Sequence, residues 1–132
     1  MAGLRMPTHG LEMSTPPKDG VTSVKFCYEE DKADLLLISS WDHSVSIHSV
    51  STNTLRYSYD HGAPVLGACF TSGGTEVCSA GLDKTVKKFS VGSEPTGAGG
   101  QIIGQHDSPV KCICYVRDDD LLVSGSWDKT VR

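Results

Sequence analysis

The chain has 132 residues, a formal net charge of −4, and 38% hydrophobic and 21% charged residues. This length predicts one domain with a buried core, and the acidic balance argues against a nucleic-acid or acidic-membrane partner, which would favour a basic surface. The 14 glycines indicate a turn-rich β protein. No apolar run reaches the roughly 18 residues of a membrane span, and the first residues lack the apolar run of a secretory signal.

Short apolar runs bounded by Gly, Pro, Asp and Ser follow one another along the chain and predict an all-β protein. Residues 1–15 precede these runs and are expected to form a flexible N-terminal lead-in. Strands are expected over residues 21–28, 35–40, 44–50, 54–59, 65–70, 76–80, 85–91, 101–104, 109–115, 121–125 and from 129 onward. No segment carries apolar residues at helical spacing.

Two motifs recur together at one period. The first is an apolar run followed by an Asp turn, as in LLLISSWDHSV, EVCSAGLDKTV and LLVSGSWDKTV, and its Asp residues are 41 and 45 residues apart. The second motif ends in an aromatic residue and recurs at 44 and 45 residues. Four short strands in about 40–45 residues are typical of a β-propeller blade. We therefore assign repeats to residues 16–60, 61–105 and 106–132, which make about two and a half four-stranded blades.

The repeats resemble WD repeats, and this resemblance implies a structural network at each Asp turn. The turn residues are Asp42, Asp83 and Asp128. His61 and His106 each lie 22 residues before an Asp. The first repeat has Pro17 where the histidine should be, at the start of the upstream motif. In WD repeats the loop His reaches the turn Asp, and a Ser or Thr of the second strand joins them. A buried carboxylate needs such donors, because its burial without them costs several kcal/mol.

A hydrolase triad of Ser79, His61 and Asp83 is the competing interpretation of the same residues. A catalytic triad is one geometry at one site. The equivalent residues recur in the third repeat, so a structural role is favoured, and we expect no enzymatic activity and no cofactor.

A more specific resemblance extends from about Pro16 to Arg132. The stretches PPKDGVTSVKF, LLLISSWDHSV, HGAPVLGACF, AGLDKTVK, HDSPVKCICY and VSGSWDKTV resemble the Bub-type family of mitotic spindle-checkpoint WD-repeat proteins, the third member of the budding-uninhibited-by-benzimidazole set. The sister family of messenger-RNA export WD-repeat proteins matches fewer of these stretches. The resemblance implies a seven-bladed, non-catalytic propeller in the nucleus and at kinetochores. It would dock GLEBS motifs of checkpoint kinases and read a kinetochore scaffold, without direct contact with nucleic acid or membrane.

The resemblance also implies that Trp41 and Trp127 take part in docking the GLEBS motif. Each precedes a turn Asp, on the face where propellers bind partners, and Leu82 occupies the equivalent position in the middle repeat. Exposed Trp is enriched at interface hot spots. The alternative is that both tryptophans only pack between adjacent blades.

The five cysteines, Cys27, Cys69, Cys78, Cys112 and Cys114, fit neither a disulfide framework nor a zinc site. We expect them to be small buried apolar residues in an intracellular reducing compartment, with no metal bound.

The last residues, SWDKTVR, end inside the third expected strand of the third repeat. The sequence thus predicts a truncated propeller that is at best marginally folded and self-associates through open flanks. Val24, Phe26, Val110 and Ile113 are expected to be poorly covered. A non-functional truncated product is the alternative to a docking scaffold.

Overall fold

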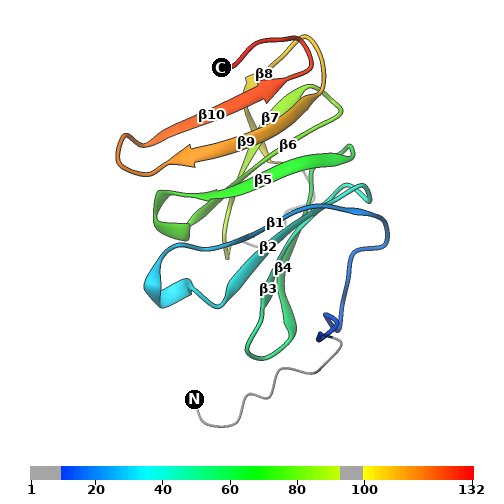
Figure 1. Cartoon of the computed structure of the whole chain (residues 1–132), viewed down its shortest axis with the longest axis vertical. Helices are drawn as coiled ribbons and strands as arrows, with labels where there is room; N and C mark the ends of the chain where they lie inside the picture. Colours follow the sequence, from blue (N-terminus) through cyan, green and yellow to red (C-terminus); the bar gives the residue numbers. More distant parts are fainter. Residues whose placement is uncertain (1–9, 93–99) are drawn as a thin grey trace.

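Three antiparallel sheets make up the computed structural model, which describes residues 10–92 and 100–132 (Figure 1). Residues 1–9 of the expected lead-in lie outside the described residues. The first sheet contains β1 (Val21–Phe26), β2 (Leu35–Ser40), β3 (Ser44–Ser49) and β4 (Thr54–Asp60). The second sheet contains β5 (Val65–Thr71), β6 (Glu76–Gly81), β7 (Thr85–Ser90) and β8 (Gln101–Gln105). The third contains β9 (Val110–Val116) and β10 (Leu121–Ser126).

In each sheet the strands pair in chain order, and each strand runs antiparallel to its neighbour. This is the meander of a propeller blade, and the fold is an all-β partial propeller. Two short 3-10 turns, η1 (Glu30–Lys32) and η2 (Ser72–Gly74), follow β1 and β5. Among the described residues, no helix has the length and apolar content needed to cross a membrane.

The strand expected from residue 129 onward does not form as an element. Val131 makes an isolated bridge to Gly125, and the Arg132 amide donates to the Ser124 carbonyl at 2.9 Å. These last residues therefore lie along β10 and continue its hydrogen bonding over a short distance only.

The core lies between successive sheets. Leu37, Val45 and Ile47 of the first sheet form one cluster with Ala68 and Phe70 of β5. A second cluster joins the other face of the second sheet to the third sheet, through Cys69, Cys78, Ala80, Val86, Val110 and Ile113. Every residue of β5 is buried, because this strand is covered on both sides.

The outer face of the first sheet is open. Val24 and Phe26 are 58% and 59% exposed, which confirms that they are poorly covered. The same expectation for Val110 and Ile113 is wrong, because these side chains point from β9 toward the second sheet and are 0% and 4% exposed.

The cysteines divide into two groups. Cys27, Cys69 and Cys78 are buried, and burial raises the pKa of Cys69 to about 12 and that of Cys78 to about 11. Cys112 and Cys114 are exposed on β9, so the expectation that all five are buried is wrong for this pair. All five are free thiols.

Candidate functional site

The three Asp turns, which we define as residues 40–44, 81–85 and 126–130, share one backbone conformation. The residue after each Asp has a left-handed φ, an uncommon conformation for a side chain other than glycine. These residues are His43 (74°), Lys84 (70°) and Lys129 (72°). Each Asp accepts the amide N–H of the residue two positions later, over 2.8 Å from Ser44, 3.1 Å from Thr85 and 2.8 Å from Thr130. The carboxylate thus fixes the turn locally.

In the second repeat, a buried histidine joins the strand to the turn. His61 Nδ1 lies 2.7 Å from Ser79 Oγ, and His61 Nε2 lies 3.0 Å from Asp83 Oδ1. Burial lowers the pKa of His61, although the Asp83 carboxylate opposes this shift. Burial works against ionisation of Asp83, but the hydrogen bond from His61 and that from Thr85 hold the pKa of Asp83 below its usual value.

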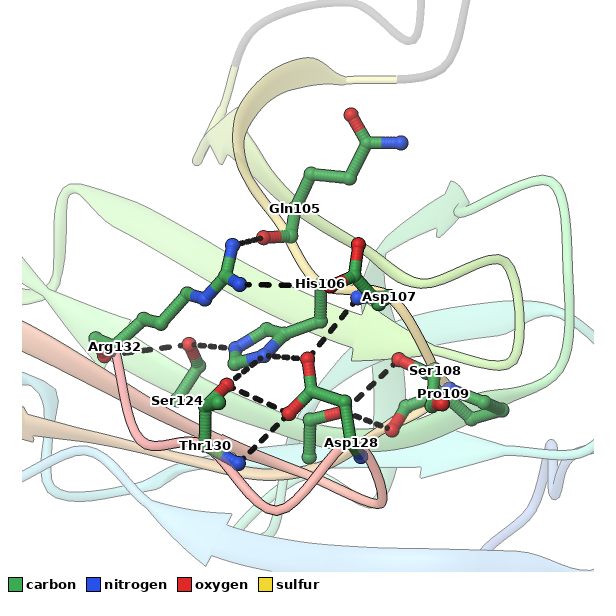
Figure 2. Close-up of polar contacts among 10 residues, drawn as sticks. Gln105, His106, Asp107, Ser108, Pro109, Ser124, Asp128, Thr130 and Arg132 are labelled. Carbon is green, nitrogen blue, oxygen red and sulfur yellow. Dashed lines mark hydrogen bonds and ion pairs between the residues drawn. The ribbon is translucent and has the colours of Figure 1, made fainter.

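The third repeat brings the same three residue types together, with the two ring nitrogens of the histidine exchanged (Figure 2). The His106 ring lies between Ser124 and Asp128, with Nε2 2.8 Å from Ser124 Oγ and Nδ1 2.9 Å from Asp128 Oδ2. Asp128 also accepts the Asp107 amide at 3.0 Å and the Thr130 hydroxyl at 2.6 Å. Burial disfavours the charged form of Asp128, but these hydrogen bonds outweigh it and hold its pKa far below the usual range.

The first repeat lacks the histidine, and its second strand, β2, also lacks the serine that binds the histidine in the other repeats. Asp42 accepts the Lys18 amide at 2.8 Å, as Asp128 accepts the Asp107 amide. Ile38, which is 4% exposed, stands four residues before Asp42, at the position of Ser79 and Ser124 in the other repeats. With Pro17 in place of the histidine, a buried hydroxyl at this position would lose its ring partner, and an apolar side chain avoids that cost.

One part of the turn was missed by the sequence analysis. Ser40 Oγ donates to the Gly20 carbonyl at 3.0 Å, and Ser126 Oγ donates to the Pro109 carbonyl at 2.9 Å. The middle repeat has Gly81 instead, because a Cβ there would lie 2.3 Å from the Pro64 carbonyl oxygen. The signal was readable in SSWD, AGLD and GSWD, where this position lies two residues before the Asp.

Trp41, Leu82 and Trp127 form a row along the Asp turns, which we call the docking row. Their amides donate to the carbonyls of Gly20, Pro64 and Pro109 at 2.9, 3.0 and 3.1 Å. This pairing gives the three side chains the same place in each repeat. Trp41 and Trp127 are 42% and 56% exposed, and Leu82 is half-buried. The row therefore presents two large apolar rings to solvent at one end of the sheets.

The structure argues against a hydrolase triad of Ser79, His61 and Asp83. Ser79 and His61 are both 0% exposed, so a substrate cannot reach the hydroxyl. The equivalent Ser124, His106 and Asp128 repeat the arrangement in the third sheet. In both repeats these hydrogen bonds connect the second strand of the sheet to the Asp turn that follows it, which is a structural role.

Comparison with known proteins identifies the repeats. The family model described as WD domain, G-beta repeat matches residues 52–90 and 100–132. The chain is 39% identical over 128 residues to mitotic checkpoint protein BUB3.1 of Arabidopsis thaliana, covering 96% of this chain and 35% of that protein. It is 30% identical over 121 residues to mitotic checkpoint protein bub3 of Dictyostelium discoideum, covering 92% and 34%.

A second group of relatives is named for messenger-RNA export rather than for the mitotic checkpoint. The mRNA export factor GLE2 of Chaetomium thermophilum is 34% identical over 128 residues, covering 92% of this chain and 35% of that protein. The chain thus spans about a third of the length of the curated relatives that it matches.

Proposed function

The chain belongs to the WD domain, G-beta repeat family, and from that premise we propose that it is a peptide-docking scaffold of the mitotic spindle checkpoint. Its partners are GLEBS motifs of checkpoint kinases, and it acts in the nucleus, at kinetochores. Two similar proteins carry the name mitotic checkpoint protein, which supports this choice of process. In the intact family member, a kinetochore scaffold is a further partner.

The docking row is the observation that carries the proposal. Trp41 and Trp127 expose 42% and 56% of their surface at equivalent places, with Leu82 between them in the chain. Trp combines a large apolar area with few rotatable bonds, and it is enriched among residues that dominate binding energy. Such a row fits an apolar segment of a peptide that runs across the three turns.

The proposed scaffold is non-catalytic. Ser79 and His61, which with Asp83 have the composition of a hydrolase site, are 0% exposed, and the same residue types recur in the third sheet. Asp42, Asp83 and Asp128 of the turns, together with His61 and His106, hold the backbone that presents the docking row.

Titration calorimetry with a synthetic GLEBS peptide tests the proposal. Trp41→Ala and Trp127→Ala should each weaken binding by about 2 kcal/mol or more, the range of interface hot spots, which is roughly a 30-fold rise in Kd. Phe26→Ala is the matched control, because Phe26 is as exposed as Trp127 but lies on β1, on the outer face of the first sheet. Unchanged affinity in both Trp variants would reject the docking row as the binding surface. If the wild-type chain did not bind the peptide at all, the alternative of a non-functional truncated product would be favoured.

A role in messenger-RNA export is the second candidate, since GLE2 is as extensively matched as the checkpoint proteins. Cells that lack the protein distinguish the two roles. A checkpoint role predicts failure to arrest in a spindle poison, whereas an export role predicts accumulation of polyadenylated RNA in the nucleus.

A further inference from the structure

A cleft lies at the end of the sheets opposite to the Asp turns. It has a volume of about 440 Å³ and is lined by Tyr28, Glu29, Glu30, Asp31 and Arg117. The first four residues belong to the connection from β1 to β2, and Arg117 follows β9. Between these two connections lies the short β5–β6 turn, which contains Gly73 and Gly74 (Figure 1, left edge). The β5–β6 turn (residues 72–75) is as short as the β9–β10 turn (residues 117–120), and the β1–β2 connection (residues 27–34), which supplies most of the lining, is longer than both.

The Tyr28 ring of this cleft contacts a second aromatic ring and a guanidinium. The rings of Tyr28 and Tyr115 stack with centroids 6.4 Å apart. Arg117 Cζ lies 5.1 Å from the centroid of the Tyr28 ring, and Arg117 Nη2 lies 3.3 Å from Glu29 Oε1. The cleft is therefore already built to hold a guanidinium between an aromatic face and a carboxylate.

Arg117 is held loosely in this position. Its side chain is 62% exposed, and an exposed ion pair gains little over hydration of the two charges. Tyr28 is also 40% exposed, so a second guanidinium from solvent can reach the same ring once Arg117 moves away.

The surrounding connections carry uncompensated negative charge. Four carboxylates there have no hydrogen-bond or ion-pair partner among the residues that the structure describes. These are Glu30, Asp31, Asp118 and Asp119. The two nearby cations are engaged, since Lys32 Nζ donates to the Gly73 carbonyl at 3.0 Å and Arg117 pairs with Glu29. A concave surface with this charge concentrates cationic ligands.

We propose that this cleft docks an arginine-bearing basic segment of a partner protein. An arginine of the partner stacks on Tyr28 and pairs with Glu29, and it displaces Arg117, which acts as a competitor within the chain. Arginine fits better than lysine, because its planar guanidinium stacks on a ring and bonds a carboxylate through two N–H groups. The cleft and the docking row lie at opposite ends of the sheets, so one partner does not exclude the other.

Fluorescence anisotropy with the 132-residue chain tests this proposal. The probe is a labelled octapeptide of alternating arginine and glycine, in about 50 mM salt to limit screening. We expect saturable binding, at least tenfold weaker binding by Tyr28→Ala, and several-fold weaker binding by the Glu30→Gln/Asp31→Asn double variant. Arg117→Ala should bind several-fold more tightly.

Lys18→Ala is the matched control, because it removes the same charge at the opposite end of the sheets. Its affinity should stay close to that of the wild type, and a lysine–glycine octapeptide should bind several-fold more weakly than the arginine peptide. Equal tightening by Lys18→Ala and Arg117→Ala would show attraction to net charge alone and overturn the site. The absence of binding, unchanged affinity in Tyr28→Ala, or equal affinity for a glutamate–glycine octapeptide would also overturn it.

Discussion

His48 on β3 is a buried histidine that only one neighbour satisfies. His48 is 1% exposed. Its Nε2 lies 3.1 Å from Ser46 Oγ, whereas its Nδ1 has no hydrogen-bond partner among the described residues. Burial lowers the pKa of His48 below its ordinary value of 6.5, as it does for His61. Both rings are therefore held neutral in the folded chain at a pH where the unfolded chain takes up protons.

The free energy of unfolding should therefore fall as the pH drops below about 6.5, because the unfolded state binds more protons. Each histidine contributes a slope of at most about 1.4 kcal/mol per pH unit. Urea denaturation at pH 7.5 and pH 5.5 measures the effect. His48→Leu should lose less stability over this interval than the wild type. The same loss in both proteins would contradict neutral burial of His48.

In the first repeat, Pro17 stands in place of the loop histidine and Ile38 in place of the strand serine, and we expect the two positions to be energetically coupled. Ile38→Ser should destabilise the chain by about 2–4 kcal/mol, because it removes buried apolar volume and leaves a hydroxyl without a partner. Adding Pro17→His should recover about 1 kcal/mol by supplying the ring that His61 and His106 supply elsewhere. A double-mutant cycle from urea denaturation measures this coupling. Strictly additive effects would show that the two positions are independent.

At the scale of the elements, Gly81 ends β6 where the chain passes close to Pro64. A Cβ at Gly81 would lie 2.3 Å from the Pro64 carbonyl oxygen, whereas a Cβ at Gly104 on β8 would meet Val86 at an ordinary 3.6 Å. Gly81→Ala should therefore cost about 1–3 kcal/mol through overpacking. Gly104→Ala should change stability by less than about 1 kcal/mol. Thermal or urea unfolding compares the two, and similar losses would mean that the backbone at Gly81 relaxes without strain.

The elements also show what the sequence could predict. The ten strands follow from alternating apolar runs and turn residues, which are local signals. The contacts of His61 with Asp83 and of His106 with Asp128 are those that the resemblance to WD repeats implies. The burial of Val110 does not follow from such signals, because it depends on which face of β9 meets the second sheet.

The docking row and the cleft at Tyr28 and Arg117 also differ in how far the sequence could predict them. The docking row could be read from the residue before each turn Asp, since the repeat places it automatically. The contact between Tyr28 and Arg117 joins residues that lie 89 positions apart. It depends on how the first and third sheets pack on the two faces of the second sheet, which no local pattern encodes.

At the scale of the whole molecule, the outer face of the first sheet is an apolar surface open to solvent. Val24 and Phe26 are more than half exposed on it, and such patches favour association. We expect the 132-residue chain to self-associate, and Val24→Lys/Phe26→Asp to shift it toward monomer in sedimentation velocity. Val50→Lys is the control, since Val50 is exposed outside the strands. Association that the double variant does not reduce would place the contact elsewhere.

The complete burial of β5 has a consequence for the order in which the molecule opens. The second sheet is covered on both faces, whereas the first and third sheets are each covered on one. Stacked sheets that contact only their neighbours can loosen one at a time from the ends. In amide hydrogen exchange, the amides of β5 and β6 should therefore be the last to take up deuterium, and those of β1 and β10 should exchange through local openings that leave the middle sheet intact.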